Sequence, residues 1–191
     1  MEPRESMDQP NFEQEDRPSY EIRKAVPGDV VAIRTMHAQS WRDTYISEEH
    51  GVSADYINGI TGKWLTPEAL EKSVEYMAGV FDDPKHFYRV ALLDGEVAGF
   101  VHANIREDGT RYLGGLYTDR STHGTGLGQQ LMGFVDEWAQ GEQIDLEVAS
   151  YNERAKSFYR KYGFVETGTP EGLRYDGIPI VVMTRYAGET Q

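Results

Sequence analysis

The chain contains no cysteine, and this absence excludes several kinds of chemistry at once. The protein cannot have a disulfide framework, a cysteine nucleophile or a thiolate metal site. The sequence also lacks any apolar run near the roughly 20 residues that a membrane helix needs, and it opens without a signal-peptide pattern. We therefore expect a cytoplasmic protein with no membrane partner.

Basic residues are scarce. There are 19 lysines and arginines against 32 aspartates and glutamates, which gives a net charge of −13. A nucleic-acid binder would need a basic surface, so we expect no nucleic-acid partner. An acidic surface attracts cationic ligands, although solubility alone explains such a charge equally well.

Two further catalytic signatures are missing. The five histidines show no spacing typical of a metal site, so we expect no metal ion. The sequence also has no Gly-x-Ser-x-Gly motif, which argues against a serine hydrolase of the α/β-hydrolase type.

The acidic residues are dense at the start of the chain. Residues 1–19 hold six of them against two arginines, with three prolines and few apolar side chains. Because such a segment buries too little apolar surface to offset its ordering entropy, it predicts a disordered acidic tail. The remaining charge of −9 belongs to one expected domain, residues 20–186, followed by a short tail, residues 187–191.

The apolar periodicity predicts alternating strands and helices. The expected strands are 20–25, 87–93, 96–105, 111–118, 144–149, 164–168 and 178–186, and the last follows an Asp176-Gly177 turn. The expected helices run from an Asp29 cap to about Tyr45, over 55–60, from a Thr66 cap to about Phe81, from Leu127 past Trp138, and over 152–162. This order predicts an α/β protein, a mixed sheet with helices on both faces.

The stretch Leu116 to Leu131 passes from a strand through glycines at 124, 126 and 128 into a helix. Unpaired N–H groups and the helix dipole make such a helix start suitable for phosphate. The spacing excludes a dinucleotide fingerprint, since Gln129 or Leu131 stands where its last glycine belongs, and no Gly-Lys-Ser/Thr of a P-loop is present. A glycine-rich turn without a ligand is the alternative.

Two segments carry a family resemblance. His123-Gly124-Thr125-Gly126-Leu127-Gly128 resembles the pyrophosphate loop of the GNAT-type N-acetyltransferases, with His123 where that family usually has Arg or Gln. The run from Asn152 to Phe164 resembles the family's Asn-x-x-Ala-x-x-Phe-Tyr segment with its Gly-Phe close. The resemblance covers residues 20–186 and implies the GNAT fold, a mostly antiparallel sheet of about seven strands.

The resemblance implies acetyl-CoA as the cosubstrate. The residues implied to bind it are Leu116, Tyr117, Thr118, His123, Gly124, Thr125, Gly126, Leu127, Gly128, Gln129, Asn152 and Tyr159. The implied role of Tyr159 is that of a general acid that protonates the leaving thiolate, whereas a half-buried helix aromatic is the simpler alternative. Arg120, Arg154 and Lys156 could add contacts to the outer phosphate.

The acceptor side is less defined. Trp41-Arg42-Asp43-Thr44-Tyr45 resembles bacterial small-molecule members, which implies a small cationic amine with Trp41 and Tyr45 as a binding wall, unless these two are core residues. The strand 111–118 contains no carboxylate, so His102 or a water chain is a candidate general base, and His37, Glu48 and Glu49 lie in the acceptor half.

The leading hypothesis is thus an N-acetyltransferase that acts by direct attack of the amine. The alternative is a GNAT-fold module that binds acyl-CoA as a sensor or interaction surface without turnover. A homodimer is compatible with either hypothesis.

Overall fold

The computed structural model describes residues 18–169 and 177–188, and these form one seven-stranded sheet in the order β1-β2-β3-β4-β5-β7-β6. The strands are β1 (Glu21–Lys24), β2 (His86–Leu93), β3 (Glu96–Ile105), β4 (Arg111–Thr118), β5 (Ile144–Ala149), β6 (Val165–Gly168) and β7 (Ile180–Arg185). Among the described strands, β4 and β5 are the one parallel pair. The expected mixed, mostly antiparallel sheet is confirmed. Of the expected tails 1–19 and 187–191, residues 1–17 and 189–191 lie outside the described residues, as does Asp176 of the expected turn.

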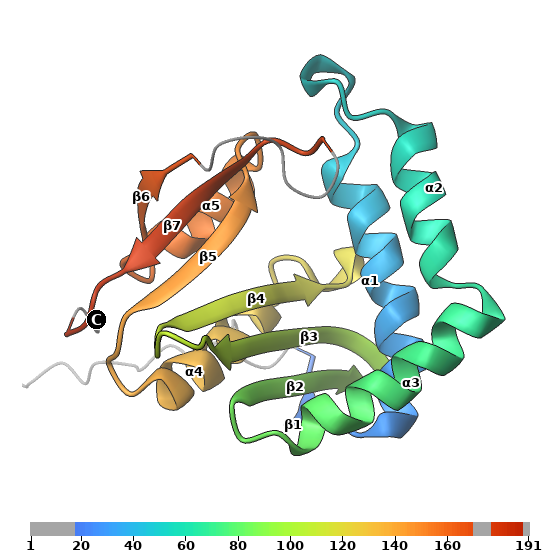
Figure 1. Cartoon of the computed structure of the whole chain (residues 1–191), viewed down its shortest axis with the longest axis horizontal. Coiled ribbons are helices and arrows are strands. Elements are labelled where there is room, and N and C mark those ends of the chain that lie inside the picture. The colour runs from blue at the N-terminus through green and yellow to red at the C-terminus, as the bar shows by residue number, and fades with distance from the viewer. Residues whose placement is uncertain (1–17, 170–176, 189–191) are drawn as a thin grey trace, which may run out of the picture.

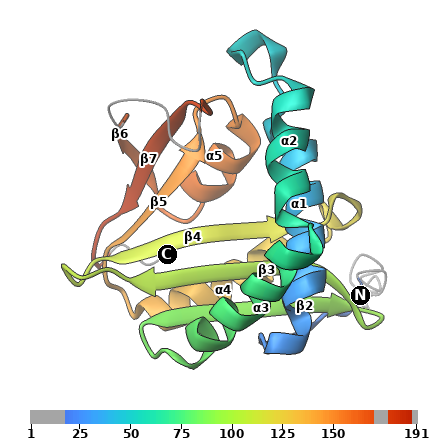
Figure 2. The ribbon, with the colours of Figure 1, turned by 45° about the vertical axis from the view of Figure 1, so that its right-hand side comes forward.

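Helices cover both faces of this sheet (Figures 1 and 2). They are α1 (Val30–Tyr45), α2 (Ala54–Trp64), α3 (Pro67–Asp82), α4 (Leu127–Ala139) and α5 (Glu153–Arg160), with short 3₁₀ turns at Pro27–Asp29, Glu48–His50 and Arg120–Thr122. Figure 2 shows α1, α2 and α3 in front of the sheet and α4 and α5 behind it.

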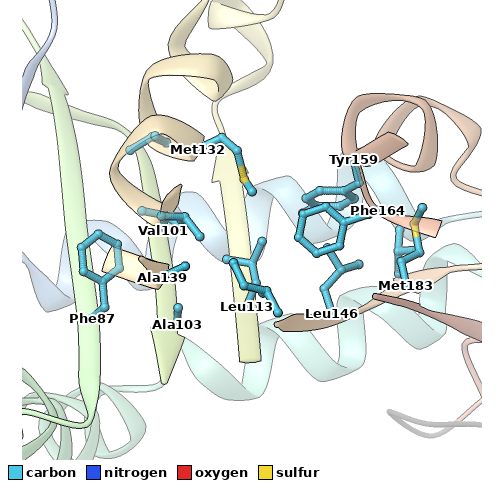
Figure 3. Close-up of a cluster of buried hydrophobic side chains, with 14 of the residues drawn as sticks. Phe87, Val101, Ala103, Leu113, Met132, Ala139, Leu146, Tyr159, Phe164 and Met183 are labelled. Atoms are coloured by element: carbon cyan, nitrogen blue, oxygen red, sulfur yellow. The ribbon is translucent and has the colours of Figure 1, made fainter. Parts of the chain in front are cut away.

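The main core lies between the sheet and the α4–α5 layer (Figure 3). Leu113 of β4 and Leu146 of β5 meet Met132 of α4 there, and all three side chains are buried. Full burial of such a side chain stabilises the fold by about 1.5–3 kcal/mol. Because side chains alternate along a strand, the polar residues Asp145 and Glu147 of β5 point to the face opposite the core.

The helix starts follow the expected caps in two of three cases. Thr66 Oγ1 accepts from the Ala69 N–H at 3.3 Å, and Asn152 Oδ1 accepts from the Ala155 N–H at 3.1 Å. The expectation that the Asp29 side chain caps α1 is wrong. A 3₁₀ turn precedes the helix, and the Asp29 carboxylate instead accepts from the Val26 N–H at 2.9 Å and from both terminal nitrogens of Arg23.

Helix α2 is longer than the predicted turn at 55–60. It extends from Ala54 to Trp64, and the Ser53 hydroxyl accepts from the Tyr56 N–H at its start. Glycine in a helix interior costs roughly 1 kcal/mol, and Gly59 and Gly62 lie inside this helix. These two residues hide the helical pattern in the sequence.

The sheet divides where β4 and β5 separate (Figure 1). Their pairing runs from Arg111 opposite Ile144 to Leu113 opposite Leu146, and within the described residues it ends there. On the other edge of β4, the register with β3 shifts so that Gly114 is an extra, bulged residue. A Cβ at Gly114 would lie 2.9 Å from His102 Nδ1, so the bulge favours glycine. Beyond Leu113, β4 and β5 are no longer paired, and the two faces of the sheet meet at this separation.

Candidate active site

Two cavities meet at this separation of β4 and β5. The glycine-loop cavity, about 440 Å³, is bounded by the end of β4, the loop before α4 and the start of α5. The aromatic cavity, about 460 Å³, lies between helices α1 to α3 and the sheet. The two share the lining residues Tyr45, Gly114, Gly115, Tyr117 and Glu147.

The glycine-loop cavity has the geometry of an anion site. Gly124 and Gly126 have φ angles of +84° and +92°, which side chains rarely adopt, and α4 begins directly after Gly126. Farther along, a Cβ at Gly128 would already lie 3.5 Å from the Phe158 ring. The geometry at this helix start therefore suits phosphate oxygens.

The structure brings eleven of the twelve predicted cosubstrate residues to this cavity, and Thr125 is the exception. The Thr125 hydroxyl donates to the Thr122 carbonyl at 2.7 Å and accepts from the Tyr20 hydroxyl at 2.8 Å. Thr125 therefore fixes the loop against β1 rather than lining the cavity.

Cationic side chains at the cavity divide into two groups. Arg120 and Arg154 line it, and Arg154 Nη2 lies 3.1 Å from His123 Nε2. Burial, with Arg154 adding to the effect, lowers the pKa of His123. The expectation that Lys156 contacts a phosphate is wrong, because its ammonium is buried and paired with Glu153 at 2.5 Å.

The edge of β4 beyond Leu113 is open. Leu116, Tyr117 and Thr118 line the glycine-loop cavity, and none of them has a pairing partner on β5 among the described residues. Their main-chain groups on this edge can pair with an extended ligand, as an added strand would.

Tyr159 is both a core residue and a lining residue of the glycine-loop cavity. Its side chain is 8% exposed and packs in the core, with its ring centroid 5.7 Å from that of Phe164 (Figure 3), and it also lines the glycine-loop cavity. Burial raises the pKa of Tyr159, and Tyr117 and Tyr112 add to this effect. Its hydroxyl therefore keeps its proton at neutral pH.

Trp41 and Tyr45 both line the aromatic cavity, with ring centroids 4.8 Å apart. Trp41 is also a core residue at 4% exposure, and its indole N–H donates to His37 Nε2 at 2.9 Å. The Trp64 ring lies 4.8 Å from Trp41 and 5.1 Å from His37, so the cavity wall is almost continuously aromatic at this point.

His37 and His102, which line the aromatic cavity, have lowered pKa values. Burial lowers the pKa of His37 to about 3, with Arg34 adding to the effect. Burial and the neighbouring His86 lower the pKa of His102 to about 4, and His102 Nε2 lies 3.2 Å from His86 Nδ1. Both His37 and His102 are therefore neutral at physiological pH.

Glu147 is the functional candidate that the sequence reasoning missed. It is half-buried on β5 and lines both cavities, whereas Glu48 and Glu49 are exposed in a 3₁₀ turn and line neither. One signal was present: the apolar alternation from Ile144 to Val148 places residue 147 on the face opposite the core.

Metal and membrane sites have no structural support in the described part of the chain. No group of three or more His, Asp or Glu side chains there could hold a metal ion. Within the same residues, no helix is long and apolar enough to cross a bilayer.

Comparison with known proteins agrees with this site. The model of the acetyltransferase (GNAT) family matches residues 38–164. An uncharacterized N-acetyltransferase in the pepI 3′ region of Lactobacillus delbrueckii subsp. lactis is 30% identical over 129 residues, which are 59% of this chain and 74% of that protein.

Solved structures share the fold. The PaiA N-acetyltransferase from Thermoplasma acidophilum, in complex with coenzyme A, has a TM-score of 0.67 at 22% identity and covers 88% of this chain and 99% of its own. The ribosomal-protein-S5-alanine acetyltransferase from Vibrio fischeri has a TM-score of 0.65 at 17% identity, with 90% and 95% covered. The chain therefore belongs to the GNAT acetyltransferase family and is an acetyl-CoA-dependent N-acetyltransferase.

Proposed function

We propose that this enzyme transfers the acetyl group of acetyl-CoA to a primary amine of a small molecule, with Glu147 as the general base and Tyr159 as the general acid. The observation that carries the proposal is the opening between β4 and β5, where the two cavities share Glu147 and the bare backbone of Gly114 and Gly115. A thioester entering from one side can meet an amine entering from the other.

Direct attack suits this geometry. With no cysteine in the chain, no thiol can carry an acyl-enzyme intermediate. The amine nitrogen would attack the carbonyl carbon, and the carbon–sulfur bond would then break. A main-chain N–H on the open edge of β4, between Leu116 and Thr118, would stabilise the oxyanion.

Glu147 is favoured as the base by position and charge. The acceptor arrives as an ammonium and must lose a proton before it attacks. Because the pKa of His102 is lowered to about 4, that histidine loses its usual advantage over a carboxylate at neutral pH. Glu147 in addition attracts the ammonium and lies where the cavities meet, whereas His102 lines the aromatic cavity alone.

Tyr159 would complete the transfer on the other side. Its side chain lines the glycine-loop cavity, and its raised pKa keeps the hydroxyl protonated. The departing thiolate of CoA would take this proton and leave as a thiol. Glu147 would take the proton that the ammonium loses before attack, and the second proton, which the nitrogen loses as the intermediate collapses to the amide, would return to the Tyr159 phenolate. Glu147 would then release its proton to solvent between turnovers.

A small acceptor fits the aromatic cavity better than a protein does. Its volume of about 460 Å³ lies in the range of small-molecule pockets, roughly 300–1,000 Å³. The name of the Vibrio fischeri neighbour nevertheless gives a ribosomal protein as that enzyme's acceptor. A protein amino terminus is therefore the competing acceptor in the test.

The test is release of CoA thiol from acetyl-CoA with a panel of amines and peptides, with mass spectrometry of the acetylated product. We expect small amines to be acetylated. Glu147→Gln should lower kcat/KM on the order of 10²-fold with unchanged acetyl-CoA binding. Glu49→Gln, an exposed change of the same charge, is the matched control and should leave the rate unchanged.

Two outcomes would contradict the proposal. If peptides alone are acetylated, the small-molecule acceptor is wrong while the family assignment stands. If Glu147→Gln retains full activity, Glu147 is not the base.

A further inference from the structure

The aromatic cavity does not share the charge of the whole protein. The chain carries −13, yet the charged side chains on the described lining of this cavity are one carboxylate, Glu147, and one guanidinium, Arg34. His37 and His102 are neutral there because their pKa values are lowered. The overall acidity therefore does not indicate which ligand the cavity takes.

Arg34 has no carboxylate partner among the described residues. Its Nε donates to the buried Ser73 hydroxyl at 3.2 Å, and its guanidinium carbon lies 5.9 Å from the Trp64 ring centroid. The side chain is half-buried, and a cation withdrawn from water is costly unless it is paired. Its planar fork of N–H groups matches a carboxylate, which it can bind in a bidentate manner.

The two charges come from different walls of the cavity. Glu147 stands on β5, where the two cavities meet, whereas Arg34 stands on α1, lines the aromatic cavity alone and contacts Ser73 of α3. An α-amino acid carries its amine and carboxylate on one carbon, so it suits two charges on different walls poorly. The space between them is lined by rings: His37, Trp41, Trp64 and Phe100.

We infer that the acceptor is an elongated amine with an aromatic-sized apolar body and a distal carboxylate, and that Arg34 binds this carboxylate. The inference rests on the proposed function and names its substrate class. The amine lies at Glu147, the body contacts the rings, and the anionic end reaches Arg34. A polyamine is disfavoured, because its far ammonium would face the Arg34 guanidinium.

The test compares three amines: 4-(2-aminoethyl)benzoate, 2-phenylethylamine and spermidine. We expect the benzoate to exceed phenylethylamine in kcat/KM by about tenfold or more, as one charge-assisted bidentate contact would give, and spermidine to be poorest. Arg34→Met should abolish this preference, because kcat/KM for the benzoate should fall to about that for 2-phenylethylamine.

A matched control separates local contact from the long-range field. Arg42→Met removes the same charge from the same helix at a residue that lines neither cavity, so the preference should persist. Calorimetric binding of the benzoate to the CoA-bound enzyme gives a readout independent of turnover and should weaken in Arg34→Met alone.

The possible failures are distinguishable. If spermidine or phenylethylamine is the best acceptor, or if Arg34→Met leaves the ratio of rates unchanged, the inference is overturned while the acetyltransfer to small amines stands. If no amine in the panel is bound or acetylated, the inference and the proposed small-molecule acceptor are both overturned.

Discussion

The glycine-loop cavity and the aromatic cavity recognise ligands by different means. Around the first, positive-φ glycines and a helix start offer main-chain groups, whereas the second is lined by rings and by single charges on side chains. An acidic protein can thus bind an anionic cosubstrate, because backbone dipoles do not depend on net charge. In neither cavity does the charge of the whole chain select the ligand.

The largest effect on the enzyme is expected from a change at Tyr159. Tyr159→Phe keeps the ring and its packing against Phe164 but removes the proton donor, so kcat should fall on the order of 10²-fold. Acetyl-CoA affinity, measured by calorimetry, should change little because the loop and β4 edge are intact. Tyr162→Phe, on a tyrosine that lines neither cavity, is the control, and equal rates for both variants would remove Tyr159 from the chemistry.

A smaller effect is expected from Gly126→Ala. The methyl group would occupy the backbone approach to the pyrophosphate, and we expect acetyl-CoA to bind about tenfold more weakly, a loss of about 1.4 kcal/mol. Gly109→Ala shares the backbone strain, with a φ of +86° against +92°, but lies in the β3–β4 turn away from both cavities. Both variants should lose similar thermal stability, and comparable losses of affinity in both would show that strain, not phosphate access, is responsible.

Low pH should lower the stability of the folded protein through His37. The pKa of His37 is about 3 in the folded protein and near 6.5 when unfolded, so the unfolded chain binds more protons between these values. Stability should therefore be complete above pH 6.5 and fall as the pH drops toward 3. His37→Gln should flatten this decline in melting temperature, whereas His50→Gln, on an exposed histidine, should reproduce the wild-type curve. A wild-type slope in His37→Gln would contradict the assignment.

The smallest effect is expected at the amino terminus. Deleting residues 1–18 removes a net charge of −4. The melting temperature and the KM for both substrates should stay within error. A clear change in either KM would show that the tail, or the charge it carries, contributes to binding.

The cosubstrate side was predictable because backbone geometry demands certain residue types at fixed spacing. The bounds of β4 and β5, the glycine turn before α4 and the Asn152 cap all follow from local pattern. The linear motif predicts that Thr125 binds the cosubstrate with its neighbours. It cannot show that the Thr125 hydroxyl instead bonds to Tyr20.

The acceptor side could not be derived in the same way. Glu147 acquires its place from the separation of β4 and β5, and that separation depends on pairing between strands distant in sequence. Lys156 and Arg34 have the same formal charge, yet one is buried against carboxylates and the other faces a cavity. Tertiary packing decides which of these charges is available to a ligand.

The bond between the Tyr20 and Thr125 hydroxyls has a practical consequence for protein engineering. It joins the segment before β1 to the loop at the start of α4, 105 residues later. A truncation that begins at residue 19 keeps this tether, whereas one that begins at Glu21 removes it and releases Thr125. The functional beginning of the domain therefore precedes its first strand by one residue, and fusion partners belong upstream of Tyr20 with a spacer between.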